Sequence, residues 1–149
     1  MKPSVALREV LAEEGFSVKT ERKDLTLEFL LQKHPQESLW NLSLDIKSPT
    51  LWELLGRELE AKVDIPVANY SLNCHADEKW RSGVYMGPDF DIEFKKYAKL
   101  CISKYFGPCI VASRDVASFV RYATLHPYIL GRSSAKTTEV LAIWDSIKF

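Results

Sequence analysis

Two stretches decide the fold: LTLEFLL at residues 25–31 and WNLSLDIK at residues 40–47. In both, apolar side chains recur at every second position, which is the spacing of a β-strand with one buried face. The polar connector between them, residues 34–38, is short enough for a hairpin. The sequence therefore predicts that residues 25–32 and 39–47 pair antiparallel. The side chains expected to face the core are Trp40, Leu42, Leu44 and Ile46, and those expected to face water are Asn41, Ser43 and Asp45.

Helical spacing of apolar residues predicts helices on both sides of this hairpin. The expected helices cover residues 4–14, 51–61 and 89–106, and Gly107-Pro108 is expected to end the third of them. The apolar run 109–112 predicts a buried strand. Ser113 is the expected cap of a helix that ends at His126-Pro127. Shorter expectations are an edge strand at residues 16–19 and a final docked helix at residues 138–149.

This mixture of elements predicts an α+β fold, with a small antiparallel sheet packed against several helices. The chain has 149 residues, the size of one ordinary domain, and 46% of them are apolar. No repeat or Gly/Ser/Pro-rich linker divides the sequence. We therefore expect a single domain over residues 1–149.

The composition restricts the class of partner. Twenty Lys and Arg residues balance twenty Asp and Glu residues, so no overall positive charge favours nucleic acid. No window has the ~20 apolar residues that a membrane span requires, and the N-terminus lacks the apolar stretch of a signal peptide. We expect a cytoplasmic protein that does not enter a membrane.

The cysteines are few and scattered. Cys74, Cys101 and Cys109 are odd in number and far apart in the sequence, which fits neither a disulfide framework nor paired metal ligands. We expect free thiols, no metal bound to them and no cofactor.

Two enzymatic hypotheses remain open. Asp91, Glu93 and Lys95 are the residue types with which metal-dependent nucleases hold a divalent ion and an attacking water, but that chemistry normally sits on a strand. Here the three residues open a helix, where acidic side chains already stabilise the N-terminus. Cys74 and His75, followed by Asp77, are the residue types of a cysteine hydrolase, with His34 or His126 as other possible bases. Adjacent residues rarely face each other productively.

A nucleic-acid-binding module is a third hypothesis. The C-terminal third is locally basic, and its basic residues alternate with aromatic residues that could stack on bases. The basic residues are Arg114, Arg121, Arg132 and Lys136, and the aromatic ones are Tyr122, His126 and Tyr128. Such a pattern is more often a solvated helix face.

The hypothesis that we favour from the sequence is a small protein-binding module of the inhibitor, immunity-protein or adaptor type. Trp, Tyr and Arg are the usual anchors of protein interfaces, and several lie in or near the polar loop that precedes residue 85. The expected contacts to another protein are Trp80, Arg81, Tyr85, Trp52 and His75, with the alternative that both Trp residues fold into the core. We assign no catalytic residue from the sequence, because no segment supports an enzymatic site as well as these residues support protein binding.

Overall fold

The two period-two stretches form strands of nine residues each in a computed structural model, which describes residues 2–34, 39–72, 83–85 and 87–130. Strand β2 (Thr26–His34) pairs antiparallel with strand β3 (Leu39–Lys47), and Phe29 lies opposite Leu44. The predicted hairpin is therefore confirmed. Leu42, Leu44 and Ile46 are fully buried on the expected face, and Trp40 is half-buried against the same core.

Three shorter strands complete the sheet, and every pairing is antiparallel. Strand β1 (Lys19–Glu21) pairs with β2, three residues later than the expected edge strand begins. Strand β4 (Ala68–Ser71) and strand β5 (Val84–Tyr85) share the free edge of β3. β5 lies beside the first two residues of β3 and β4 lies beside residues 43–46. On this edge of β3, residues 41 and 42 therefore have no neighbouring strand among the described residues.

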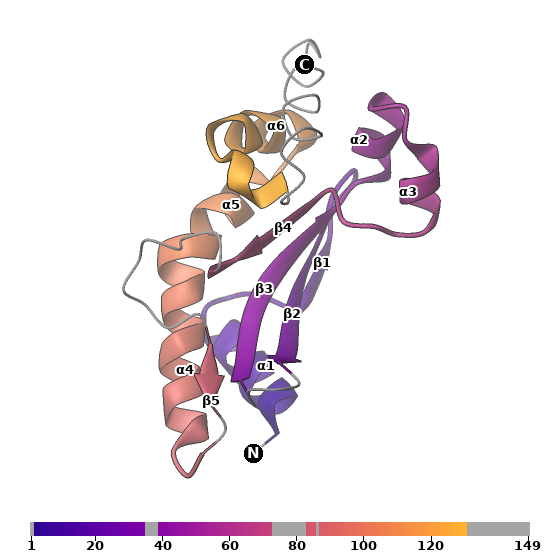
Figure 1. Ribbon diagram of the computed structural model, residues 1–149. Helices are drawn as coiled ribbons and strands as arrows, with labels where there is room; N and C mark the ends of the chain where they lie inside the picture. Colours follow the sequence, from indigo (N-terminus) through magenta and orange to yellow (C-terminus); the bar gives the residue numbers. More distant parts are fainter. Residues whose placement is uncertain (1, 35–38, 73–82, 86, 131–149) are drawn as a thin grey trace.

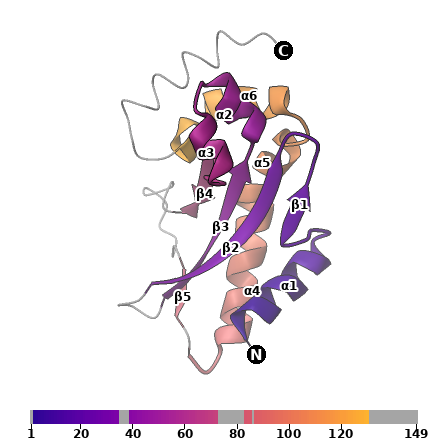
Figure 2. The same cartoon turned by 90° about the vertical axis from the view of Figure 1, so that its right-hand side faces the viewer.

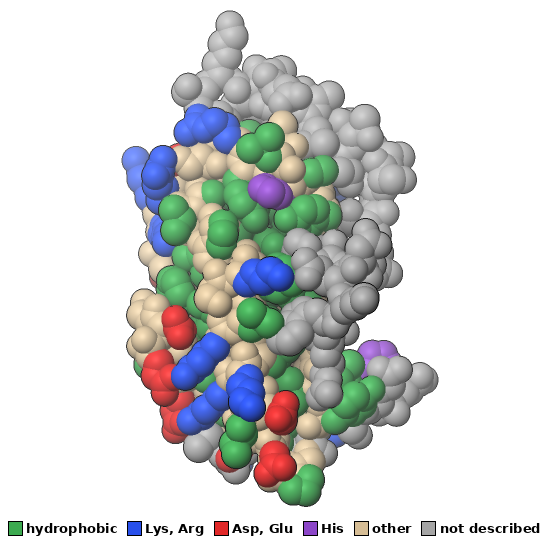
Figure 3. All heavy atoms as spheres, turned by 90° about the vertical axis from the view of Figure 1, so that its left-hand side faces the viewer, with side chains coloured by type: hydrophobic (Ala, Val, Ile, Leu, Met, Phe, Trp, Pro, Cys, Tyr) green, Lys and Arg blue, Asp and Glu red, His purple; other side chains and the backbone are tan. Residues whose placement is uncertain are grey.

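Helices cover one face of this sheet. Helices α1 (Pro3–Glu13) and α4 (Phe90–Leu100) lie side by side, and in Figure 2 α4 runs behind β2 and β3. Figure 1 shows α4 along the side of the sheet. Two ion pairs of 3.1 Å join these helices, Lys95 to Glu9 and Lys99 to Glu13. Figure 3 shows acidic and basic side chains gathered next to one another on the lower part of one face of the molecule. The arrangement confirms the predicted α+β fold.

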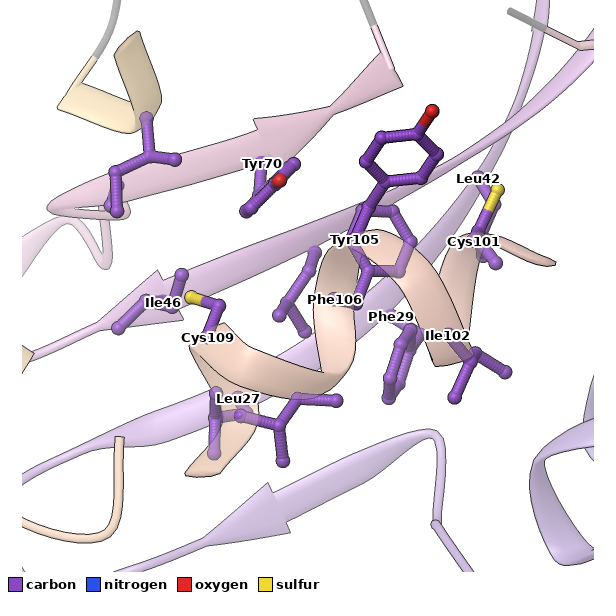
Figure 4. Close-up of a cluster of buried hydrophobic side chains, with 14 of the residues drawn as sticks. Leu27, Phe29, Leu42, Ile46, Tyr70, Cys101, Ile102, Tyr105, Phe106 and Cys109 are labelled. Atoms are coloured by element: carbon purple, nitrogen blue, oxygen red, sulfur yellow. The ribbon is translucent and has the colours of Figure 1, made fainter. Parts of the chain in front are cut away.

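A large part of the core lies between the sheet and the helical residues 101–109 that follow α4 (Figure 4). Phe106 is its centre: its ring meets Phe29 of β2 at 6.1 Å and Tyr70 of β4, edge-on, at 5.2 Å between ring centroids. Cys101 and Cys109 are free thiols buried in the same cluster. Burial raises the pKa of each thiol to about 12, because an apolar environment disfavours the thiolate.

The structure corrects the prediction for residues 107–112. The long helix does not end at Gly107: a π-helical segment (Cys101–Phe106) continues it into α5 (Gly107–Ala112), so the expected strand at residues 109–112 is wrong. The Gly107 N–H donates to the Ile102 carbonyl five residues back, and a Cβ at Gly107 would lie only 2.9 Å from that oxygen. Pro108 stands in the first turn of α5.

Helix α6 (Val116–Leu125) exists as predicted, but a different residue caps it. Asp115 accepts a 2.7 Å hydrogen bond from the Ser118 N–H. Ser113 is buried instead, and its hydroxyl donates to the Cys109 carbonyl at 2.7 Å. A 3₁₀ turn (Pro127–Leu130) follows α6.

The single helix expected over residues 51–61 is also wrong. Two short helices replace it, α2 (Pro49–Leu54) and α3 (Glu58–Lys62). Gly56 between them has φ of 71°, a conformation in which a side chain would be strained. The chain therefore turns at Gly56, and α2 and α3 stand together at one end of the sheet (Figures 1 and 2).

The second face of β3 is less wet than predicted. Ser43 is only 3% exposed and Asp45 only 8% exposed, so both lie inside the protein. The period-two pattern correctly predicted that both side chains face away from the apolar core. However, β3 is a central strand with neighbours on both sides. Ser43 stands between Leu30 and Ser71 of its neighbours, and flanking side chains cover a small residue in such a position. The predicted exposure of these two residues is therefore wrong.

Within the described residues, no helix combines the length and the apolar character that crossing a membrane requires. The expected helix at residues 138–149 lies outside the described part of the chain.

Candidate functional site

Trp52, one of the five expected partner contacts, belongs to the interior. It is 8% exposed, and its indole N–H donates to the Ile65 carbonyl at 2.8 Å. The Arg57 guanidinium lies over its ring at 5.1 Å from the centroid. Trp52 therefore joins α2 to the segment after α3 and is not available as an exposed anchor.

Tyr85, another expected contact, is exposed on β5. It lies at the opposite end of β3 from Trp52, because β5 pairs with the first two residues of β3 and α2 begins two residues after its end. Nine residues at ~3.3 Å each separate the two ends. Trp52 and Tyr85 do not form one surface. The other expected contacts, His75, Trp80 and Arg81, lie outside the described residues.

The structure exposes an apolar surface that sequence reasoning missed. Leu59 is 70% exposed and Val63 is 56% exposed, and their spacing of four residues places them on one side of α3. Leu54 and Ile65 are also exposed, at the end of α2 and just after α3. We call these four residues the α2–α3 surface.

Local geometry explains why these side chains point outward. An unbroken helix would have placed Leu59 on the same stripe as buried Leu51. The turn at Gly56 rotates α3 away from that stripe, and none of the five residues of α3 is buried. A second left-handed residue, Asp64 with φ of 60°, then returns the chain toward β4. Gly56 was the only signal for this arrangement in the sequence.

Polar contacts join the residues around the α2–α3 surface to one another and to β3. Arg57 Nε and Nη2 both donate to Glu60 Oε1, at 2.9 and 2.6 Å, while the guanidinium lies over Trp52. Lys47 of β3 donates to Asp64 at 2.9 Å. Ser48 caps α2 by accepting the Leu51 N–H at 3.1 Å. These contacts link β3, α2 and α3 around the exposed apolar side chains.

The surroundings of the α2–α3 surface carry more acidic than basic residues. Residues 49–65 contain four acidic residues, Glu53, Glu58, Glu60 and Asp64, against two basic ones, Arg57 and Lys62. Glu60 and Asp64 are engaged by Arg57 and Lys47. Glu53 and Glu58 are both exposed at the border of the apolar residues.

The structure describes the residues of only one of the two enzymatic hypotheses. Asp91, Glu93 and Lys95 lie in the first turns of α4, and Lys95 pairs with Glu9 of α1. The described residues include no group of three or more His, Cys, Asp or Glu side chains placed to hold a metal ion. Cys74, His75 and Asp77 lie outside the described part of the chain.

The C-terminal aromatic residues pack against one another. The rings of Tyr122 and His126 are 4.3 Å apart, and the Tyr128 hydroxyl is 3.0 Å from His126 Nδ1. Tyr128 also meets Tyr70 of β4 edge-on at 5.7 Å. These partly buried rings do not present free faces in a row, as stacking on bases requires. Arg132 and Lys136 lie outside the described residues.

Comparison with protein-family models, with curated proteins and with solved structures finds no significant match to this chain. The site therefore has to be interpreted from its own geometry.

Proposed function

We propose that this protein is a protein-binding module, of the inhibitor, immunity-protein or adaptor kind, and that its partner docks on the α2–α3 surface. The observation that carries the proposal is the exposure of Leu54, Leu59, Val63 and Ile65 together at one corner of the fold. Grouped apolar side chains with a polar border are typical of interaction sites, whereas single exposed apolar residues are common on any surface.

The chemistry of the corner defines the partner. Leu59 and Val63 offer an apolar row one helical turn long, and Glu53 and Glu58 border it with negative charge. A complementary segment has its own apolar row flanked by Lys or Arg, because opposite charges at the rim favour encounter and fix the orientation.

The test compares two exposed apolar residues on different parts of the fold. Leu59→Glu places a charge in the α2–α3 surface, and Leu125→Glu makes the same change at the exposed end of α6. A photo-reactive amino acid at position 59 in the native host should crosslink one protein, and the same label at position 125 should not. Purified partner should lose at least tenfold in affinity for Leu59→Glu and bind Leu125→Glu as it binds the wild type.

Other results would contradict the proposal. Equal affinity for the wild type and Leu59→Glu, with both variants folded, would remove the α2–α3 surface as the docking site. Crosslinking of a second copy of this chain at position 59 would replace the partner with self-association. If Trp80→Ala or Tyr85→Ala abolishes binding at an unchanged melting temperature while Leu59→Glu does not, the partner binds through residues 80 or 85 and not through the α2–α3 surface.

A further inference from the structure

Part of the outer edge of β2 carries backbone groups that no described strand uses. β1 lies beside only one end of β2 and reaches no further than Glu28 (Figure 2). The next contact on this edge is the Phe29 N–H, which donates to the Val18 carbonyl at 2.8 Å. Beyond Phe29, no strand among the described residues pairs with β2 on this side. We call residues 30–34 the open edge.

The direction of the free groups follows from two hydrogen bonds that are formed. In an antiparallel strand, the N–H and C=O groups of every second residue point to the same side. The Phe29 N–H points away from β3, so the N–H and C=O groups of Leu31 and Lys33 also point away from it. The Leu42 N–H agrees: Leu42 lies opposite Leu31, and its N–H leaves β3 on the far side, for the Tyr97 hydroxyl. Unpaired groups in such a row are a template for another strand.

The open edge is accessible and already has the shape of a strand. Gln32, Lys33 and His34 are exposed, and Leu30 and Leu31 are only partly buried. β3 holds all five residues in a ladder, so little further ordering is needed when a strand is added. A second strand that is also preformed therefore pairs more readily than an extended peptide, which has to be ordered first. The balanced charge of the chain does not keep two copies apart.

We propose that two copies of this chain pair antiparallel through their open edges, about a twofold axis at Gln32. Leu31 of each copy then lies opposite Lys33 of the other, and the two residues exchange N–H···O=C hydrogen bonds. The free N–H groups of Leu31 and Lys33 in both copies all gain an acceptor. A twofold interface requires a surface that is complementary to itself, and the open edge meets that requirement.

The free groups and the charges select this register. An axis at Leu31 would require the Phe29 amide, which the Val18 carbonyl already holds. An axis at Lys33 would place the two lysines directly opposite each other, and like charges in that position destabilise a sheet. An axis between two residues would set outward-pointing groups against inward-pointing ones. With the axis at Gln32, the aliphatic stem of Lys33 covers the half-buried Leu31 of the other copy, while its ammonium stays in water.

The open edge is separate from the α2–α3 surface. Thr26 at the start of β2 pairs with Lys47 at the end of β3, and α2 begins two residues later. The open edge lies at the other end of this hairpin. Pairing through β2 therefore leaves the α2–α3 surface free, and each of the two proposals can fail without the other.

Disulfide trapping tests the position of the axis. All variants carry Cys74→Ser, and Cys101 and Cys109 are buried. At the axis, position 32 faces itself in a non-hydrogen-bonded pair with Cα atoms ~4.5 Å apart, a separation that a disulfide spans. Gln32→Cys should therefore form a disulfide-linked dimer under mild oxidation. His34→Cys is the matched control: its two copies lie ~13 Å apart along the strands, so it should crosslink at least tenfold more slowly.

Sedimentation equilibrium of the full chain, over a hundredfold range of concentration, measures the affinity. The wild type should change from one chain to two as its concentration rises. Gln32→Glu places two carboxylates opposite each other at the axis and should weaken the dimer at least tenfold. At low concentration it should melt as the wild type does, because position 32 is exposed. Leu59→Glu alters the α2–α3 surface and should dimerise as the wild type does.

Four results would overturn the proposal. The wild type remains a monomer over the whole range of concentration, or Gln32→Cys and His34→Cys crosslink at the same rate. Gln32→Glu dimerises with the affinity of the wild type. Finally, loss of the dimer in Leu59→Glu but not in Gln32→Glu would place self-association on the α2–α3 surface.

Discussion

The hydroxyl of Tyr97 completes the sheet at a position where strand pairing is interrupted. β5 reaches along β3 only to Trp40, where its first residue lies, and β4 reaches only to Ser43, where its last residue lies. The Leu42 N–H on that edge therefore has no strand among the described residues to donate to. It donates instead to the Tyr97 hydroxyl of α4 at 3.1 Å, inside the core. Tyr97→Phe removes this one acceptor and keeps the ring that packs against Phe94.

The size of the effect follows from the burial of the amide. An N–H left without an acceptor in the interior costs ~1–3 kcal/mol of unfolding free energy. The Tyr97 hydroxyl also contacts the Cys101 thiol, but thiols are weak hydrogen-bonding groups, so this contact adds little. For a chain of this length, ~1 kcal/mol corresponds to ~2–4 °C in melting temperature. Tyr97→Phe should therefore melt roughly 2–12 °C lower than the wild type.

Urea denaturation measures this free energy, and hydrogen exchange of the Leu42 amide locates it. The denaturant slope should not change, since the substitution exposes no new surface on unfolding. Tyr85→Phe, at an exposed tyrosine, should stay within ~0.5 kcal/mol of the wild type. The reasoning fails if Tyr97→Phe is as stable as Tyr85→Phe, or if the Leu42 amide exchanges at the same rate in both variants.

Three further predictions test the fold. Ser48→Ala should lower the unfolding free energy by ~1 kcal/mol, because Ser48 is the buried cap of α2, and an unchanged urea midpoint would contradict that role. With Cys74 replaced by Ser, Cys101 and Cys109 should react with a thiol reagent at pH 8 only after denaturant is added, since each has a pKa of about 12. Rapid labelling of the native protein would show that they are accessible. Gly83→Ala should cost ~1–3 kcal/mol, because a Cβ there would lie 2.6 Å from the Trp40 carbonyl; full stability would show that β5 can move away from β3.

The chain by itself determined the elements whose pattern is local. Period-two spacing was enough to predict the β2–β3 hairpin and its buried face, and helical spacing was enough to predict α1, α4 and α6. In each of these, the residues that decide the element lie within about ten positions of one another, so the apolar pattern is complete in the sequence.

Only the tertiary structure determined the conformation where two local sequence signals disagree, or where packing against a distant part of the chain decides burial. Gly107-Pro108 reads as a helix end, yet packing of the π-helical segment against β2 and β4 carries the helix through it. Gly56 costs little in an isolated helix, but here it turns the chain and exposes Leu59. The burial of Ser43 and Asp45 depends on β3 having strands on both sides, and alternation along one strand carries no information about its neighbours.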